Sequence, residues 1–162
     1  MRFLFVCLGN ICRSPTAEAV FRAKLKEKDL HDLMKCDSAG TSAHHEGEPA
    51  DARSREHAAL RGYDLTSLSR PLRESDFAEF DMILVMDDNN YFDVMRMARD
   101  NPIYKAKVHK FTDFCTIHNV DKVPDPYHRG DEGFELVLDI IEDASEGLLC
   151  KVIEDQKNKK RL

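Results

Sequence analysis

The stretch that decides the fold is residues 1–18, MRFLFVCLGNICRSPTAE. Residues 1–8 form a short apolar run containing Phe and Val, which is typical of a strand buried in a sheet. Gly9 and Asn10 follow at once and signal a turn. The sequence therefore predicts that the chain leaves the sheet immediately after Cys7 and Leu8.

A helix is predicted directly after this turn. Ser14 suits the cap of a helix, Pro15 suits its first position, and Glu18 suits the positive end of the helix dipole. Apolar residues then recur at helical spacing as far as about Lys28. A strand, a short loop and a helix in this order are the opening unit of an α/β fold.

The rest of the chain repeats this alternation. Residues 82–86 are continuously apolar, as in a parallel strand covered on both faces. The predicted fold class is α/β: a single domain with a four-stranded, parallel, twisted sheet and helices on both faces, and a phosphate loop between the first strand and the first helix. The further strands are expected at 33–38, 82–86 and 108–111, and the further helices at 50–61, 89–99 and 134–153, with a long loop at 112–131.

Length and composition set limits on this fold. The chain has 162 residues, of which 42% are hydrophobic and 33% charged, values of a globular domain with a packed core. We expect the domain to span 1–155 and the basic stretch 156–162 to be a frayed tail. The longest apolar runs, 3–8 and 82–86, are far shorter than the ~20 residues of a membrane span.

Charge and cysteine content exclude several classes of function. The net charge of −6 argues against nucleic acid as a partner, and means that any anion site must be built locally. Five cysteines without a CxxC pair or zinc-type spacing do not predict a disulfide framework or a metal site. The first residues lack the pattern of a signal peptide, so a cytoplasmic location is expected.

The loop at 7–14 predicts an anion site. Successive backbone N–H groups and a helix N-terminus attract anions, Gly9 allows close approach, and Arg13 can grip two phosphate oxygens. The same positive field favours the thiolate form of a cysteine, and Ser14 can donate a hydrogen bond to its sulfur. Cys7 is thus a candidate nucleophile facing a bound phosphate, the alternative being a small buried core residue.

Residues 6–15, VCLGNICRSP, resemble the phosphate loop of the low-molecular-weight protein tyrosine phosphatases. Three further segments resemble parts of that family in the right order: Ser38-Ala39-Gly40-Thr41 after the second strand, Met86-Asp87 with Asn90 after the third, and Asp125-Pro126-Tyr127 in the general-acid loop. The resemblance covers roughly residues 1–149.

The resemblance implies a two-step hydrolysis that uses no metal and no cofactor. Cys7 would attack phosphorus, Arg13 would hold the phosphate with the loop amides, and Asp125 would act as general acid and then as base. The implied substrates are phosphotyrosine proteins or aryl phosphates, inorganic phosphate is the product, and a monomer is expected. The residues implied in phosphate binding and loop support are Leu8, Gly9, Asn10, Ile11, Cys12, Ser14 and Ser38.

By resemblance, Asn10 holds the loop through hydrogen bonds, with Ser38 as partner. The family often completes this network with a histidine, and Ser67 stands there instead, so weaker support of the loop is expected. Arg70 and Asp87 are expected either to support the site from behind or to serve as plain surface and helix-capping residues.

The wall of the site is expected to contain Tyr127, His44 and His45. Tyr127 would stack on a substrate ring, unless it has a packing role, and His44 replaces an aromatic residue that is usual in the family. Cys12 would trap oxidised Cys7 as a reversible disulfide, or it simply packs under the loop. The remaining cysteines, Cys36, Cys115 and Cys150, are interpreted as structural.

Three other functions are the alternatives to this one. Arsenate reductase shares the fold but needs further cysteines after the third strand, and residues 82–99 contain none. A protein-arginine phosphatase has Thr where this chain has Ile11, and a bulky apolar side chain there would crowd a water attacking phosphoarginine. A catalytically silent phosphopeptide-binding module would be expected to lack Cys7 or Asp125.

Overall fold

The four strands form one parallel sheet in the order β2-β1-β3-β4, as seen in a computed structural model that describes all residues 1–162. Strand β1 pairs with β2 on one side and with β3 on the other, and β4 lies at the edge. The predicted α/β class with a four-stranded parallel sheet is confirmed. The strands are β1 (Arg2–Cys7), β2 (Lys35–Gly40), β3 (Met82–Val85) and β4 (Val108–Lys110).

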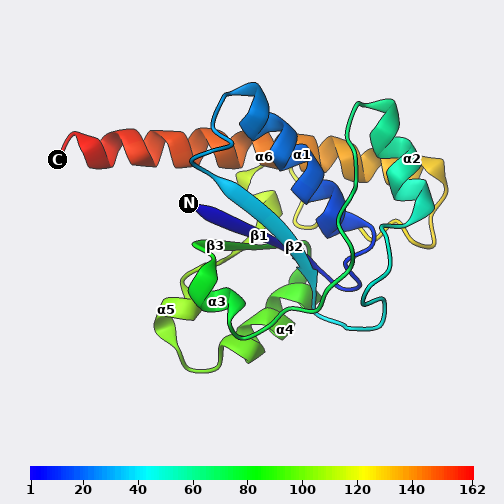
Figure 1. Ribbon diagram of the computed structural model, residues 1–162, viewed down its shortest axis with the longest axis horizontal. Coiled ribbons are helices and arrows are strands. Elements are labelled where there is room, and N and C mark those ends of the chain that lie inside the picture. Colours follow the sequence, from blue (N-terminus) through cyan, green and yellow to red (C-terminus); the bar gives the residue numbers. More distant parts are fainter.

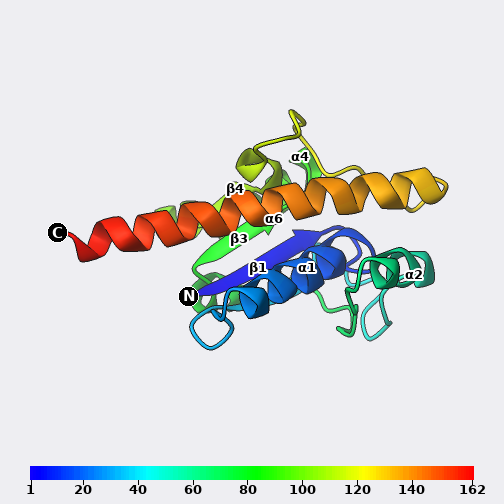
Figure 2. The same ribbon diagram turned by 90° about the horizontal axis from the view of Figure 1, so that it is seen from above.

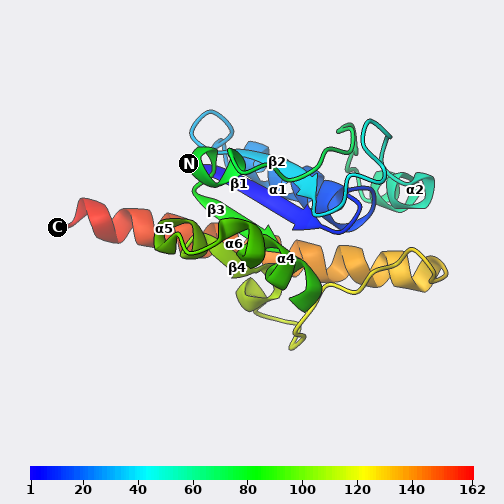
Figure 3. The ribbon, with the colours of Figure 1, turned by 90° about the horizontal axis from the view of Figure 1, so that it is seen from below.

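Helices cover both faces of this sheet. Helices α1, α2 and α6 lie on one face, while α3, α4 and α5 lie on the other (Figure 1). Figure 2 shows α1 and α6 side by side in front of the strands, and Figure 3 shows α4 and α5 on the opposite side. The helices are α1 (Arg13–Glu27), α2 (Ala52–Leu60), α3 (Asp76–Glu79), α4 (Asp88–Ala98), α5 (Pro102–Lys105) and α6 (Asp131–Lys160).

Alternate residues of β1 enter two separate cores, because successive side chains of a strand point to opposite faces. Phe3 and Phe5 pack with the residues of α1 and α6, whereas Leu4 and Val6 pack with those of α3 and α4. All four are fully buried. A strand at the centre of this sheet must therefore be apolar on both faces. The continuous apolar run at residues 3–6 is for this reason a clear sign of a sheet covered by helices on both sides.

The start of α1 differs from the prediction. The helix begins at Arg13 with Cys12 as its N-cap, and no side chain caps it. Ser14 is the second residue of the helix and Pro15 the third, and Glu18 is not in the first turn but buried against Ser38. The capping prediction was wrong because the hydroxyl of Ser14 is used inside the phosphate loop instead.

Helix α6 is longer than the apolar pattern suggested, with 30 residues that begin at Asp131 and end at Lys160 instead of at Ile153. Its last turns extend beyond the sheet, so that the C-terminus lies far from the strands (Figure 1). Residues 156–160 are thus helical but exposed. The division of the chain at residue 155 stays a prediction.

The short elements between the strands were not predicted. They are α3 and α5, together with a single 3₁₀ turn, Phe111–Phe114, that follows β4; each has only four residues, too few to show a periodic pattern. Helices α2 and α4 lie within two residues of their predicted bounds. None of the helices is both long and apolar enough to span a membrane.

Asp143 ties α6 to the segment that follows the 3₁₀ turn. Its buried carboxylate accepts hydrogen bonds from the backbone N–H groups of Thr116 at 2.9 Å, Ile117 at 3.1 Å and His118 at 2.7 Å. Burial favours the neutral acid, but these bonds, His118 first, outweigh it and hold the pKa of Asp143 below its usual range.

Asp143→Asn is expected to lower the free energy of unfolding by about 2–3 kcal/mol at pH 7, because it weakens charge-assisted hydrogen bonds. A carboxyl group with a depressed folded-state pKa stabilises the protein above its unfolded pKa, about 3.9, and this stabilisation is lost as the pH falls further. The difference between wild type and variant should therefore shrink below about pH 4. Urea unfolding at pH 7, 5, 4 and 3 measures it.

The matched control is Asp155→Asn, which removes an exposed carboxylate paired with Lys151 on the same helix. Its effect should stay below about 1 kcal/mol, as for other exposed ion pairs. Equal losses in the two variants, or a difference that does not change with pH, would contradict the role assigned to Asp143.

Candidate active site

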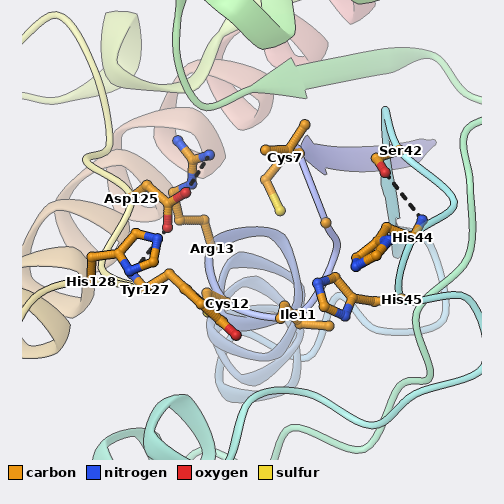
Figure 4. A pocket seen from close by; sticks show the side chains of 12 residues that line it. Cys7, Ile11, Cys12, Arg13, Ser42, His44, His45, Asp125, Tyr127 and His128 are labelled. Atoms are coloured by element: carbon orange, nitrogen blue, oxygen red, sulfur yellow. Dashed lines mark hydrogen bonds and ion pairs between the residues drawn. The ribbon is translucent and has the colours of Figure 1, made fainter.

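A cavity of about 300 Å³ opens at the carboxyl end of β1, next to the first turn of α1. Residues from three separate parts of the chain line it, since the ends of parallel strands meet at one edge of a sheet. Figure 4 shows Cys7 at its floor, between Arg13 and Asp125 on one side and His44 and His45 on the other. The lining residues are Cys7, Leu8, Gly9, Ile11, Cys12, Arg13, Ser42, His44, His45, Asp125, Tyr127 and His128.

The sulfur of Cys7 is surrounded by hydrogen-bonding groups. The residue is 3% exposed, and its Sγ lies 3.0 Å from Ser14 Oγ. The backbone N–H of Asn10 donates to the same sulfur at 3.3 Å. The sulfur thus accepts one backbone hydrogen bond and lies within hydrogen-bond distance of a hydroxyl that can donate a second, polar surroundings that fit a reactive cysteine better than a core residue.

The side chain of Asn10 fixes the shape of the loop. Its backbone has a φ of 55°, a left-handed conformation that asparagine adopts more readily than most residues. The Nδ2 group donates to Ser14 Oγ at 2.7 Å and to Ser38 Oγ at 3.0 Å, while Oδ1 accepts from the backbone N–H of Arg70 at 3.0 Å. The predicted pairing of Asn10 with Ser38 is thus present, and Ser14 is a second partner.

The network continues behind Ser38 to a buried carboxylate. Ser38 Oγ donates to Glu18 Oε1 at 2.7 Å, and Arg22 binds the other oxygen of Glu18. Ser67, which stands where a histidine is frequent, has no hydrogen bond to this network. The Glu18–Arg22 pair supports Ser38 in this chain.

The loop presents unpaired backbone donors. The N–H of Asn10 donates to the sulfur of Cys7. The other N–H groups of the loop have no acceptor within the protein; they belong to Leu8, Gly9, Ile11, Cys12 and Arg13. Backbone donors without partners, gathered around the start of a helix, form an anion-binding site. Together with the thiol they can hold the oxygens of a phosphate over the sulfur.

Arg13 is buried and held on one side only. Its Nη1 donates to Asp87 at 2.6 Å and to the backbone carbonyl of Val123 at 3.0 Å, which leaves Nε and Nη2 for a ligand. Burial alone would lower the pKa of Arg13, but the charges of Cys7 and Asp87 outweigh it and raise the pKa. Asp87 also accepts from the N–H of Asn90, so it both supports the site and caps α4.

Arg70 supports the loop through its backbone and anchors it through its side chain. Its guanidinium pairs with Asp37 and with the buried Asp76, both at 3.0 Å. Its N–H is the donor to Asn10 described above. These contacts fit the expectation that Arg70 supports the site without lining the cavity, and not the alternative that it is a plain surface residue.

Asp125 stands at the mouth of the cavity. Its side chain is 48% exposed, and its Oδ2 lies 3.9 Å from Arg13 Nη2. The other oxygen accepts from the backbone N–H of Tyr127 at 3.1 Å, which orients the carboxyl group (Figure 4). A carboxyl group across the cavity from a thiolate can deliver a proton to a departing oxygen atom.

The walls contain the predicted aromatic and histidine residues and two that the sequence did not indicate. Tyr127 is 41% exposed beside Asp125, while His45 pairs with Glu48 at 2.7 Å on the other side. His128 and Ser42 also line the cavity. Neither residue belongs to a recognisable motif. Only their positions could have indicated them, since His128 follows Tyr127 directly and Ser42 lies two residues before His44.

The second cysteine of the loop is buried near the first. Cys12 is 5% exposed, and burial raises the pKa of its thiol to about 12, so that it stays protonated. Burial likewise raises the pKa of Cys36 and of Cys115 to about 12. Cys150 is exposed on α6, so the expectation that it packs within the structure was wrong.

Comparisons with known proteins agree with this arrangement. Residues 2–159 match the family model described as low molecular weight phosphotyrosine protein phosphatase. A putative low molecular weight protein-tyrosine-phosphatase of Synechocystis is 42% identical, with 98% of this chain and 100% of the relative covered.

Solved structures show the same similarity. A protein tyrosine phosphatase from Entamoeba histolytica superposes with a TM-score of 0.93 at 47% identity, covering 96% of this chain and 99% of that one. An arginine phosphatase from Drosophila superposes with a TM-score of 0.87 at 30% identity, covering 94% and 98%. Both similarities extend over nearly the whole fold and not only over the phosphate loop. The chain therefore belongs to the low molecular weight phosphotyrosine protein phosphatase family.

Proposed function

We propose that this chain hydrolyses phosphotyrosine in proteins, and aryl phosphates in general, through a phosphate ester of Cys7. The observation that carries the proposal is the position of the Cys7 sulfur beneath unpaired loop N–H groups, with Arg13 and Asp125 on the opposite wall. The family and the relatives named above support the choice of substrate.

In the first step the thiolate of Cys7 attacks phosphorus, and the bond between phosphorus and the phenolic oxygen breaks. Nε and Nη2 of Arg13 and the loop N–H groups bind the equatorial oxygens, where negative charge is concentrated in the transition state. Asp125 donates its proton to the departing oxygen. This proton is needed because a tyrosine phenolate, of pKa ~10, is a moderately poor leaving group.

In the second step a water molecule replaces the phenol. Asp125, now ionised, takes a proton from this water as it attacks phosphorus, and the bond between sulfur and phosphorus breaks. The hydrogen bonds from Ser14 and from the N–H of Asn10 stabilise the thiolate as it leaves. Inorganic phosphate is released, and Cys7 and Asp125 return to their starting states.

Cys12 is proposed to protect Cys7 from irreversible oxidation. A peroxide would oxidise the Cys7 thiolate to a sulfenic acid, and the Cys12 thiol would then displace water to form a disulfide. Because burial keeps Cys12 protonated, it does not compete with Cys7 for the substrate in the reduced protein. Both cysteines are free thiols in the structure.

Cys7→Ser is expected to lower kcat by at least about 10⁴-fold, because a neutral hydroxyl replaces the thiolate nucleophile. The assay uses a phosphotyrosine peptide with reductant present. Cys150→Ser, which changes an exposed cysteine remote from the cavity, is the control and should retain full activity. Substantial turnover by the Cys7 variant would mean that another group attacks phosphorus.

Asp125→Asn is expected to lower kcat/KM for the phosphotyrosine peptide by roughly 10²–10⁴-fold, the usual contribution of a general acid. The loss should be much smaller with 4-nitrophenyl phosphate, whose nitrophenolate leaves without a proton. Asp121→Asn removes an exposed carboxylate from the same loop and should change neither value. Equal losses on the two substrates would show that Asp125 does not protonate the leaving group.

Ile11 is expected to direct the site toward phosphotyrosine and away from phosphoarginine. Its side chain lines the cavity next to Cys12, and an apolar group there favours an aryl ring over a guanidinium. Ile11→Thr, which replaces an ethyl group by a hydroxyl, should raise the ratio of phosphoarginine to phosphotyrosine turnover by about tenfold. Turnover of both substrates is compared by release of inorganic phosphate.

The control for this prediction is Ile11→Val, which has the shape of threonine but stays apolar. It should keep the preference for phosphotyrosine. A wild-type protein that prefers phosphoarginine would place this chain functionally with the Drosophila relative and would make the argument from Ile11 wrong.

A further inference from the structure

Arg53, in the first turn of α2, lies between the acid-bearing loop and the start of α6. Its guanidinium carbon is 5.3 Å from the centre of the Tyr127 ring and 4.8 Å from that of Phe134. Distances below about 6 Å over the ring face are those of cation–π contacts. One charged group thus contacts two aromatic rings that come from different segments of the chain.

Asp51 fixes the direction of this guanidinium. Its carboxylate accepts from Arg53 Nη2 at 3.2 Å and from Nε at 3.3 Å, so the pair is bidentate. The same carboxylate caps α2 by accepting from the backbone N–H of Arg53 at 2.9 Å. Because the cap and the ion pair share one carboxylate, the arginine has little freedom to turn away from the rings.

Asp51 and Phe134, two partners of Arg53, also contact the phosphate loop. The backbone N–H of Asp51 donates to the carbonyl of Ile11 at 2.8 Å. Phe134 packs in a small buried cluster with Ile11 and Cys12. The start of α2 is therefore bonded to the phosphate loop directly through Asp51 and linked to it indirectly through the contact of Arg53 with Phe134.

Tyr127 transmits this position to the general acid. Its backbone N–H donates to Asp125 Oδ1 at 3.1 Å, and the two side chains stand next to each other at the cavity mouth (Figure 4). The side chain of Asp125 is 48% exposed and Tyr127 is 41% exposed, whereas Pro126 between them is buried. Pro126 therefore anchors the backbone of this segment, and the contact of the Tyr127 ring with Arg53 is a constraint on its exposed side.

We infer that Arg53 is a positioning residue for the reaction: through Tyr127 it holds Asp125 at the distance from the phosphate loop that proton delivery to the leaving group requires. The inference rests on the proposed role of Asp125 as general acid. Arg53 itself does not touch the reacting atoms. Its effect is expected on leaving-group protonation and not on phosphate binding, because the loop donors and Arg13 are held by other contacts.

The decisive variant is Arg53→Met, which keeps an unbranched apolar side chain but removes the charge and the bond to Asp51. The cap of α2 survives, since it uses the backbone N–H of residue 53 and that of Ser54. Arg55→Met is the matched control, because Arg55 is an exposed arginine two residues further along the same helix. Arg53→Lys restores the positive charge without the planar fork.

Each variant is assayed for kcat/KM on a phosphotyrosine peptide and on 4-nitrophenyl phosphate, and for inhibition by inorganic phosphate. Arg53→Met should lose about 10-fold to 100-fold on the peptide, part of the full contribution of the acid, and less than about 3-fold on 4-nitrophenyl phosphate. Inhibition by phosphate should be unchanged. Arg53→Lys should recover part of the loss, and Arg55→Met should match wild type.

The inference would be overturned if Arg53→Met lost kcat/KM equally on both substrates, or lost none at all. Weaker inhibition of Arg53→Met by phosphate, or an equal loss of kcat/KM in Arg55→Met, would also overturn it. Thermal melting of each variant shows whether it is folded, and Arg53→Lys carries the test if Arg53→Met is not. The wild type and Asp125→Asn are measured alongside. A wild type inactive on phosphotyrosine, or an acid variant without leaving-group dependence, would instead refute the proposed function.

Discussion

The site depends on a loop whose backbone N–H groups must stay unpaired and converge on one point. A peptide segment left to itself would satisfy these donors with its own carbonyls or fold them into the helix that follows. Asn10 prevents this by taking a left-handed backbone conformation and by bonding with its side chain to Ser14, Ser38 and the backbone of Arg70. Two of these partners lie outside the loop, on β2 and in the segment before α3, so the fold holds the loop in addition to its own bonds to Cys7 and Ser14.

The buried charges extend the same principle to the side chains. Arg13 is almost fully buried, which would be costly for an unpaired cation, and the bonds of its Nη1 to Asp87 and Val123 offset that cost. Val123 is fully buried and its N–H donates to the carbonyl of Met86 at the end of β3. Arg13, proposed to bind phosphate, and the loop that carries Asp125 are therefore anchored to the same strand end. Beyond Val123 the loop is anchored again at the buried Pro126, while the side chains of Asp125 and Tyr127 on either side of it are partly exposed.

The fold could be predicted from the sequence because its strands are buried on both faces and its longer helices repeat an apolar period. The pattern failed where local rules compete with the site: Ser14 has the residue type of a helix cap but bonds to Cys7 instead. The catalytic candidates Cys7 and Arg13 were predictable since they are close in sequence. Asp125 could be predicted only through the resemblance to a family. It lies in a loop of 20 residues, and nothing in that loop's sequence shows which carboxylate will lie near the end of β1.

Arg53 illustrates what sequence patterns do not reveal. It stands in a stretch that the sequence predicts only as a helix, and its charge alone indicates a solvated helix face. Its importance arises from three distances that depend on the tertiary structure: to Asp51 in its own cap, to Phe134 in α6 and to Tyr127 in the acid-bearing loop. The loop around Asn10 is kept rigid by many buried hydrogen bonds. The proposed proton donor, in contrast, acts first as an acid and then as a base, and must stay accessible to water. One cation–π contact from an anchored arginine restrains such a donor without burying it, which explains why the most exposed part of the site is held by a side chain from outside the cavity.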